Sequence, residues 1–318
     1  MSKAYELSCS SSVSLSPILL PAEPGRGQRA VYIFQNILSA QECQEIIDSH
    51  TDLIPANVTT ETIRDRQIFE DEKLAEKIWG RIQPFFFLPS DEEEKKISNV
   101  EGGQDDRAER IEGRVEDKDS DIWKVSGLNE RWRLARYGPG GKFSPHTDGR
   151  RLASVNSQAF YTINIYLNTV TDGCGGATRF FSSGKEVVTK VKPVLGTAII
   201  FRDDIWHDGE VLTCPSNHPP SSQPVKYLLR TDIMFDRADP IPLSSFLSPA
   251  NGSGIESFEE WCTGKGWGDD KEKMGRRALA VAEGLEDAGV NGMEVVRWYK
   301  KAWRLWPGLE FEGGGQGL

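Results

Sequence analysis

The sequence of 318 residues contains only five cysteines and four histidines, and no apolar run approaches the roughly 20 residues that span a bilayer. The cysteines are odd in number and irregularly spaced, which excludes a secreted disulfide framework and indicates a reducing compartment. The N-terminal stretch also lacks the continuous apolar segment of a secretory signal. We therefore expect a cytoplasmic protein without a membrane span, and the nucleus stays open as a location.

Basic residues are fewer than acidic ones: the 38 Lys and Arg against 48 Asp and Glu give a net charge of -10. This balance disfavours nucleic acid or an anionic membrane surface as a partner. Much of the excess lies in residues 91–121, which hold 13 acidic and 6 basic residues. We interpret this segment as a solvated acidic loop, with a docking surface for a basic substrate as the alternative.

The N-terminal part divides into an arm and a first strand and helix. Residues 1–28 are rich in Ser, Pro and Gly, which predicts a flexible arm. A short apolar run at Val31 to Phe34 predicts a strand, and Ser39 with Glu42 three residues later forms a capping box that starts a helix. A second helix is expected over residues 70–82, before Pro84.

From residue 123 to 237 the pattern changes to short alternating runs separated by Gly, Pro, Asp and Ser clusters. This pattern is typical of an antiparallel sandwich or barrel. We predict a mainly β fold with flanking helices, whose core is a double-stranded β-helix of the jelly-roll, cupin-like type. Helical periodicity returns at 271–287 and 293–306. The predicted domains are therefore the arm 1–28, a main domain 29–245 and a C-terminal helical extension 246–318.

Two of the four histidines lie beside carboxylates at the ends of predicted strands. His146 and Asp148, in FSPHTDG, are two residues apart, so on an extended chain they project from the same face. His207, in IIFRDDIWHDG, follows the most apolar strand, and a β fold could bring it opposite. Two imidazoles and a carboxylate form the facial triad of non-haem Fe(II) oxygenases. We predict an Fe(II) site at these three residues, whereas His50 and His218 are expected to be structural or surface residues.

The segments around this triad resemble the prolyl-4-hydroxylase-like branch of the Fe(II)/2-oxoglutarate dioxygenases. In the family's order they read YGPGGKFSPHTDG, YTINIYLN, GGATRFF, GTAIIF, WHDG and KYLLRTDIMF. The resemblance covers residues 123–237 and, more loosely, 31–49. It implies that 29–245 is a dioxygenase domain with its core at 123–237, that His146, Asp148 and His207 are the iron ligands, that 2-oxoglutarate and O2 are co-substrates, and that ascorbate is a reductant.

By the same resemblance, Lys226 binds the far carboxylate of 2-oxoglutarate through charge-assisted hydrogen bonds. Arg230 lies on the same strand face about 13 Å away, at roughly 3.3 Å per residue, so the two cannot both hold one carboxylate end-on. Arg230 is the alternative for that role; otherwise we expect it near the metal-proximal end of the co-substrate or near Asp148.

Four further residues are expected around the co-substrate. Tyr166 and Tyr137 match family tyrosines near 2-oxoglutarate, with an ordinary core aromatic as the alternative for each. Thr162 and Asn164 alternate with Tyr166 in TINIY and therefore share its face.

The resemblance implies hydroxylation of an unactivated C–H bond with release of succinate and CO2. The prime substrate is left open between a protein side chain, an amino acid and a small metabolite. One alternative is a cupin-type metal enzyme that does not use 2-oxoglutarate. Another is a catalytically silent binding module that uses the acidic loop and the C-terminal helices, although the intact triad disfavours it.

Overall fold

The structure is a computed structural model that divides into two compact units. It describes residues 12–22, 29–56, 60–87, 110–117, 120–149, 151–183, 185–213, 223–246, 254–287, 289–290 and 292–309. The first unit comprises residues 1–114, 125–151 and 159–235, and the second comprises 115–124, 152–158 and 236–318. None of the helices in these described ranges is both long and apolar enough to cross a bilayer.

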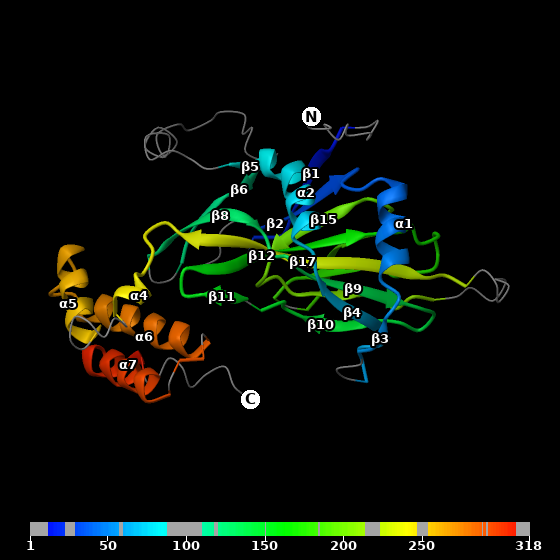
Figure 1. Ribbon diagram of the computed structural model, residues 1–318. Helices are drawn as coiled ribbons and strands as arrows, with labels where there is room; N and C mark the ends of the chain where they lie inside the picture. Colours follow the sequence, from blue (N-terminus) through cyan, green and yellow to red (C-terminus); the bar gives the residue numbers. More distant parts are fainter. Residues whose placement is uncertain are drawn as a thin grey trace, which may run out of the picture. The chain divides into compact units, whose positions relative to one another are not determined.

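Strands dominate the first unit and helices the second (Figure 1). The strands are β1 (Ser14–Leu19), β2 (Ala30–Gln35), β3 (Ile54–Pro55), β4 (Asp65–Glu70), β5 (Phe86–Phe87), β6 (Ile111–Glu112), β7 (Arg114–Glu116), β8 (Ile122–Leu128), β9 (Arg131–Tyr137), β10 (Phe143–His146), β11 (Leu152–Ser154), β12 (Ser157–Tyr166), β13 (Thr178–Phe181), β14 (Val187–Val191), β15 (Ala198–Arg202), β16 (His207–Gly209) and β17 (Lys226–Arg237). The helices are α1 (Ala40–Ser49), α2 (Glu72–Ile82), the 3-10 turn η1 (Gln83–Phe85), α4 (Leu243–Phe246), α5 (Gly254–Gly264), α6 (Lys271–Asp287) and α7 (Gly292–Leu305).

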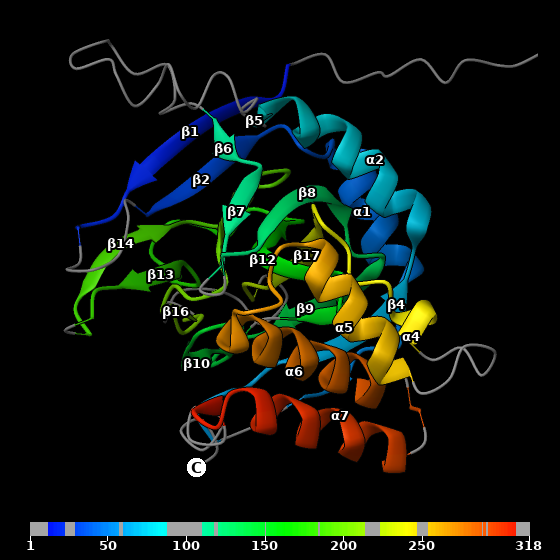
Figure 2. The same cartoon turned by 90° about the vertical axis from the view of Figure 1, so that its left-hand side faces the viewer.

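Two antiparallel sheets form the core of the first unit. The larger sheet runs in the order β1-β2-β15-β12-β17-β9-β4-β3, and the smaller one in the order β10-β16-β13-β14. The chain passes repeatedly from one sheet to the other, because β12 and β15 lie in the larger one while β13, β14 and β16 lie in the smaller one. Helices α1 and α2 cover the outer side of the larger sheet (Figure 2). The predicted mainly β, jelly-roll core with flanking helices is confirmed.

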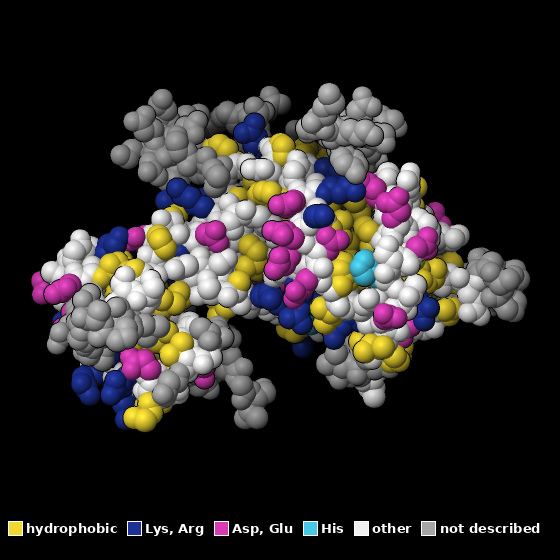
Figure 3. Space-filling view, in the orientation of Figure 1, with side chains coloured by type: hydrophobic (Ala, Val, Ile, Leu, Met, Phe, Trp, Pro, Cys, Tyr) yellow, Lys and Arg dark blue, Asp and Glu magenta, His cyan; other side chains and the backbone are white. Residues whose placement is uncertain are grey.

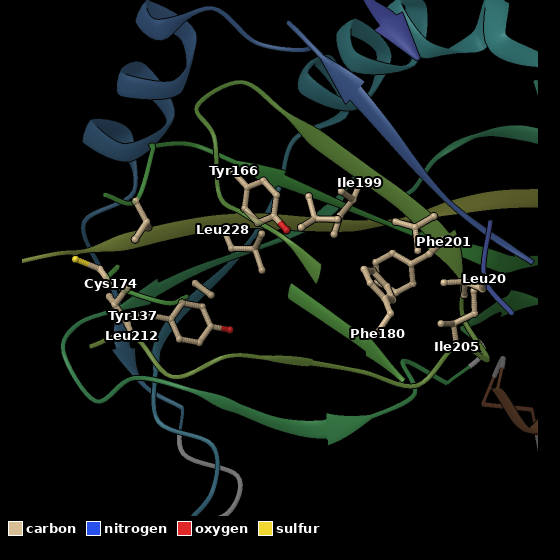
Figure 4. Packing of buried hydrophobic residues seen from close by; sticks show 14 residues of the cluster. Leu20, Tyr137, Tyr166, Cys174, Phe180, Ile199, Phe201, Ile205, Leu212 and Leu228 are labelled. Carbon is tan, nitrogen blue, oxygen red and sulfur yellow. The ribbon is translucent and has the colours of Figure 1, made fainter. Parts of the chain in front are cut away.

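Apolar side chains from both sheets fill the space between them (Figure 4). Phe180 of β13 and Phe201 of β15 meet edge to face, with ring centroids 5.1 Å apart, and both are fully buried. Aromatic pairs of this geometry stabilise a core beyond the area that they bury. Tyr137 and Tyr166 also project into this interior and belong to the same cluster of buried side chains.

The capping box at the start of α1 is confirmed. The Ser39 side chain accepts a hydrogen bond from the backbone N–H of Glu42, and the Glu42 carboxylate accepts one from the backbone N–H of Ser39. Helix α2 begins at Glu72, two residues later than predicted, because Asp71 is its N-cap and accepts a hydrogen bond from the backbone of Leu74.

The predicted flexible arm is wrong for Ser14–Leu19, which form β1. This strand pairs with β2 from Ser14 opposite Gln35 to Leu19 opposite Ala30. The serines and the proline of this segment do not prevent a strand, because β1 lies at the edge of the sheet and a proline is tolerated where a strand has only one partner. Residues 1–11 and 23–28 lie outside the described residues, as does most of the acidic loop. Its described end, from 110 onward, forms β6 and β7 and contains the buried Ile111 and Val115.

The second unit has its own apolar core, built largely from its helices. Trp298 of α7 is fully buried and packs against Phe258 of α5 and Phe246 of α4, with centroids 5.2 and 5.7 Å away. Helices α6 and α7 lie side by side in both ribbon views (Figures 1 and 2). The helix predicted at 271–287 is confirmed, and that at 293–306 is displaced by one residue, whereas α5 was not predicted.

A buried ion-pair cluster also lies in the second unit. The Asp121 carboxylate pairs with the guanidinium groups of both Arg237 and Arg277, and the three side chains are only 6–8% exposed. A buried charge of this kind depends on its partners, because it has no water to replace them.

We expect Asp121→Asn to lower the free energy of unfolding by about 3–5 kcal/mol, since two buried guanidinium groups lose their counter-charge. The control is Asp239→Asn in the exposed pair with Lys265, where the loss should be about 1 kcal/mol or less. Urea denaturation followed by circular dichroism measures both. Equal losses in the two variants would contradict a structural role for the buried cluster.

Candidate metal centre

Two strands of the smaller sheet bring the predicted ligands together. His146 ends β10 and His207 begins β16, and the two residues are directly opposite in the antiparallel register. Their ring centroids are 4.3 Å apart. The Asp148 carboxylate lies 3.5 Å from Nε2 of His146 and 3.6 Å from Nε2 of His207. Ligand atoms of all three residues lie within 4.8 Å of one another.

Backbone carbonyls orient both imidazoles. Nδ1 of His146 lies 2.8 Å from the carbonyl oxygen of Ser144, and Nδ1 of His207 lies 2.9 Å from that of Ile205. Since a carbonyl can only accept a hydrogen bond, each Nδ1 carries the proton and each Nε2 presents its lone pair toward Asp148. Burial lowers the pKa of His207 to about 4, so this imidazole is neutral at pH 7.

The Asp148 carboxylate is held in its ionised form. Its side chain is only 3% exposed, and burial alone would raise its pKa. Arg230, with Nη2 2.9 Å from one carboxylate oxygen, is the strongest opposing influence, and Thr162 donates a 2.6 Å hydrogen bond to the other oxygen. These partners, together with His207, hold the pKa well below its usual range. One ionised carboxylate and two imidazoles are a donor set that fits Fe(II).

The triad residues line a pocket that is also lined by Lys226. Lys226 begins β17, is 2% exposed, and donates a 2.7 Å hydrogen bond to the carbonyl oxygen of Gly176. Its Nζ lies 5.2 Å from the centroid of the Tyr137 ring and 5.6 Å from that of Tyr166. Burial lowers the pKa of Lys226 to about 8. Such a buried ammonium gains free energy from an anionic ligand.

The other predicted residues take different positions in this region. Asn164 lines the pocket, and its buried Oδ1 has no hydrogen-bond partner among the described residues. The Tyr166 hydroxyl donates a 2.8 Å hydrogen bond to Thr178, and the Tyr137 hydroxyl accepts a 3.4 Å one from Arg64. Thr162 contacts Asp148. The expected contact of Arg230 with the Asp148 region is observed.

Three arginines that were not predicted from the sequence line the same pocket: Arg64, Arg66 and Arg133. Arg66 lies on β4 and Arg133 on β9, in register with the strand that carries Arg230. The alternation of arginines in TIRDRQIF was a signal, but residues 65–70 were not recognised as a strand.

Residues 132–222 match the family model of the 2OG-Fe(II) oxygenase superfamily. The match includes the three triad residues and ends before Lys226. The chain therefore contains a 2OG-Fe(II) oxygenase domain, as the sequence motifs predicted, and is a 2-oxoglutarate-dependent enzyme. No curated protein was found to match the chain.

Three solved structures illustrate what the chain is similar to. A viral collagen prolyl hydroxylase from Paramecium bursaria Chlorella virus 1, in complex with 2-oxoglutarate, is 22% identical over 64% of this chain and 95% of its own, with a TM-score of 0.38. A Pseudomonas putida prolyl-4-hydroxylase is 17% identical over 65% and 92%, with a TM-score of 0.37. A Trichoplax adhaerens prolyl hydroxylase in complex with a hypoxia inducible factor peptide is 17% identical over 65% and 83%, with a TM-score of 0.38.

We expect His207→Ala to weaken binding of Fe(II), or of Mn(II) as an air-stable substitute, by at least roughly 100-fold, because even loss of an indirect ligand partner commonly costs 10–100-fold. The matched control is His50→Ala. His50 stacks on Phe69, with ring centroids 3.6 Å apart, and should not affect the metal. Calorimetric titration of metal-free protein measures both affinities. Unchanged affinity in His207→Ala would refute the metal centre.

Proposed function

We propose that the protein hydroxylates an unactivated C–H bond of its prime substrate and converts 2-oxoglutarate and O2 to succinate and CO2. The observation that supports this most strongly is that the His146, Asp148 and His207 triad and the buried Lys226 ammonium line one pocket. The first group suits a ferrous ion, and the second suits a carboxylate at a distance from that ion.

The proposed reaction balances without a further reactant. One oxygen atom of O2 is inserted into the substrate C–H bond as a hydroxyl group. The other oxygen atom enters the new carboxylate of succinate as 2-oxoglutarate loses CO2. The bound ferrous ion supplies the oxygen activation that no protein side chain can provide. Ascorbate as an auxiliary reductant stays a prediction.

The protein's own groups hold and orient the reactants. His146, Asp148 and His207 would hold the ferrous ion. Lys226 binds the far carboxylate of 2-oxoglutarate, and the rings of Tyr137 and Tyr166 surround this ammonium and keep water away from it. This arrangement orients a flexible dicarboxylate along a single direction.

Arg230 has a different role in this proposal. Its guanidinium lies 2.9 Å from Asp148 and 3.2 Å from Asp232, so it already compensates two carboxylates near the metal. We therefore assign the far carboxylate of 2-oxoglutarate to Lys226 and treat Arg230 as a positioning residue for Asp148.

We expect Lys226→Ala to raise the KM for 2-oxoglutarate by roughly 10–100-fold, because a charged hydrogen bond contributes about 1.5–3 kcal/mol. Arg230→Ala should act mainly on kcat and on metal affinity. Lys226→Met, which keeps the bulk of the side chain, controls for a packing defect. Release of succinate from 2-oxoglutarate across candidate peptides, amino acids and metabolites measures these parameters. The reverse ranking of KM would exchange the two roles.

The same assay tests the proposed function itself. A cupin-type enzyme that does not use 2-oxoglutarate would release no succinate, and a silent binding module would show no turnover. A weak visible absorption band on anaerobic addition of Fe(II) and 2-oxoglutarate is expected only for the proposed function. Absence of both the band and succinate would refute it.

The affinity for 2-oxoglutarate should also depend on pH. Burial lowers the pKa of Lys226 to about 8, partly offset by Asp208 and Glu210, so the ammonium loses its proton as the pH rises through that value. We expect the KM for 2-oxoglutarate to be lowest below pH 8 and to rise above it. Lys226→Arg keeps the charge at every accessible pH, so its KM should lack this rise. The same rise in both variants would contradict the assignment.

A further inference from the structure

The pocket has an arginine-rich side that the metal and 2-oxoglutarate leave unexplained. Ala135 of β9 is opposite Arg66 of β4, and Arg133 of β9 is opposite Arg230 of β17. Because alternate residues of a strand share a face, Arg133 and Ala135 lie on one face of β9. Arg66 and Arg230, in register beside them, project from the same face of the sheet and line the pocket with them.

The pocket carries more positive than negative charge. Five cationic side chains and two carboxylates line its described part: Arg64, Arg66, Arg133, Lys226, Arg230, Asp148 and Asp208. Both carboxylates already have cationic partners, since Arg230 pairs with Asp148 and Arg179 donates a 2.9 Å hydrogen bond to Asp208. The excess contrasts with the chain's net charge of -10 and with the acidic side chains spread over the face shown in Figure 3.

Arg66 is the clearest member of this excess. Among the described residues it has neither an ion pair nor a side-chain hydrogen bond. Burial lowers its pKa, and the neighbouring Arg64, Arg131 and Arg230 lower it further. Arg133 is only partly compensated, because within the described part of the chain it shares its carboxylate partner, Asp232, with Arg230. Half-buried guanidinium groups that repel one another gain free energy when an anion binds between them.

The bound co-substrate would not supply that anion. Under the proposed function, the two charges of the ferrous ion and the two of 2-oxoglutarate cancel, so the excess remains. Lys226 holds the far carboxylate about 13 Å along β17 from Arg230, at roughly 3.3 Å per residue. In the larger sheet, β9 separates β4, which carries Arg66, from β17, which carries Lys226.

We infer that Arg66 and Arg133 bind a carboxylate of the prime substrate and thereby place its C–H bond beside the metal. This inference rests on the proposed function and specifies its substrate as an acid. A guanidinium fork matches a carboxylate in a planar, two-point arrangement, which orients as well as attracts. The carboxylate belongs either to a free small acid or to an acidic side chain of a peptide.

The test uses the full chain loaded with Mn(II) and N-oxalylglycine, an unreactive analogue of 2-oxoglutarate. Broadening of probe resonances by the nearby Mn(II) then measures binding beside the metal. The probes are L-glutamate with L-glutamine, and a capped Gly-Glu-Gly tripeptide with its Gly-Gln-Gly counterpart. We expect the acid to bind roughly 10–100-fold more tightly than its amide in at least one pair, as for a charged hydrogen bond. The pair that shows the difference distinguishes a small acid from a peptide.

Substitution then identifies the residues responsible. Arg66→Gln and Arg133→Gln should each reduce the preference for the acid to about threefold or less. Arg136→Gln is the matched control, because Arg136 lies on the same strand β9, faces the other side and pairs with Asp65 at the surface. It should keep the full preference. Thermal unfolding checks that all variants are folded.

Three results would overturn the inference. They are the absence of any acid preference in both pairs, a preference that survives both substitutions, and a loss of N-oxalylglycine affinity in Arg66→Gln as large as in Lys226→Ala. The last result would assign Arg66 to the co-substrate. If Mn(II) or N-oxalylglycine itself fails to bind the unaltered protein, the proposed function is refuted first, so the two failures are distinguishable.

Discussion

The charge of Asp148 is the constraint on which the rest of the site depends. A carboxylate that is 3% exposed stays ionised because Arg230, the two neighbouring histidines and Thr162 compensate for the water it has lost. The Nδ1 atoms of the two neighbouring imidazoles lie within hydrogen-bond distance of the carbonyl oxygens of Ser144 and Ile205. These hydrogen bonds and the ion pair with Arg230 fix the orientation of the three side chains around one point.

Strand β17 links this centre to the remainder of the pocket. Lys226, Leu228 and Arg230 alternate along it and face the interior, so a single strand carries both the ammonium that we propose for the co-substrate and the guanidinium that pairs with Asp148. The spacing of residues along the strand keeps these two cations about 13 Å apart. Asp148 pairs with Arg230 and therefore does not also neutralise the Lys226 ammonium.

The neighbouring strands add what β17 lacks. Strand β9 contributes Tyr137 beside Lys226 and Arg133 beside Arg230, and β4 contributes Arg66 one strand further out. A catalytic pocket inside an acidic protein thus acquires a cationic interior through strand register. The net charge of -10 is a property of the whole chain and does not describe the pocket.

The clustering of His146, Asp148 and His207 could be predicted because its signal is local or has few alternatives. His146 and Asp148 are two residues apart on an extended chain, and only four histidines were available to supply the third ligand. The arginines of β4 could not be predicted, because their role follows from pairing with β9, more than 60 positions away in the sequence. Ser14–Leu19 were missed for a similar reason, since an edge strand with serines and a proline becomes recognisable only beside β2.

Local chemistry in the sequence by itself determined the helix caps, the alternation typical of strands and the residue types suited to Fe(II). Ser39 with Glu42 and the helix at residues 271–287 required no knowledge of distant contacts. Only the tertiary structure decided which faces meet, which charges lose water and which cations lack a counter-charge. Register and burial are properties of pairs of distant segments, and the pKa values of Asp148, His207 and Lys226 follow from them.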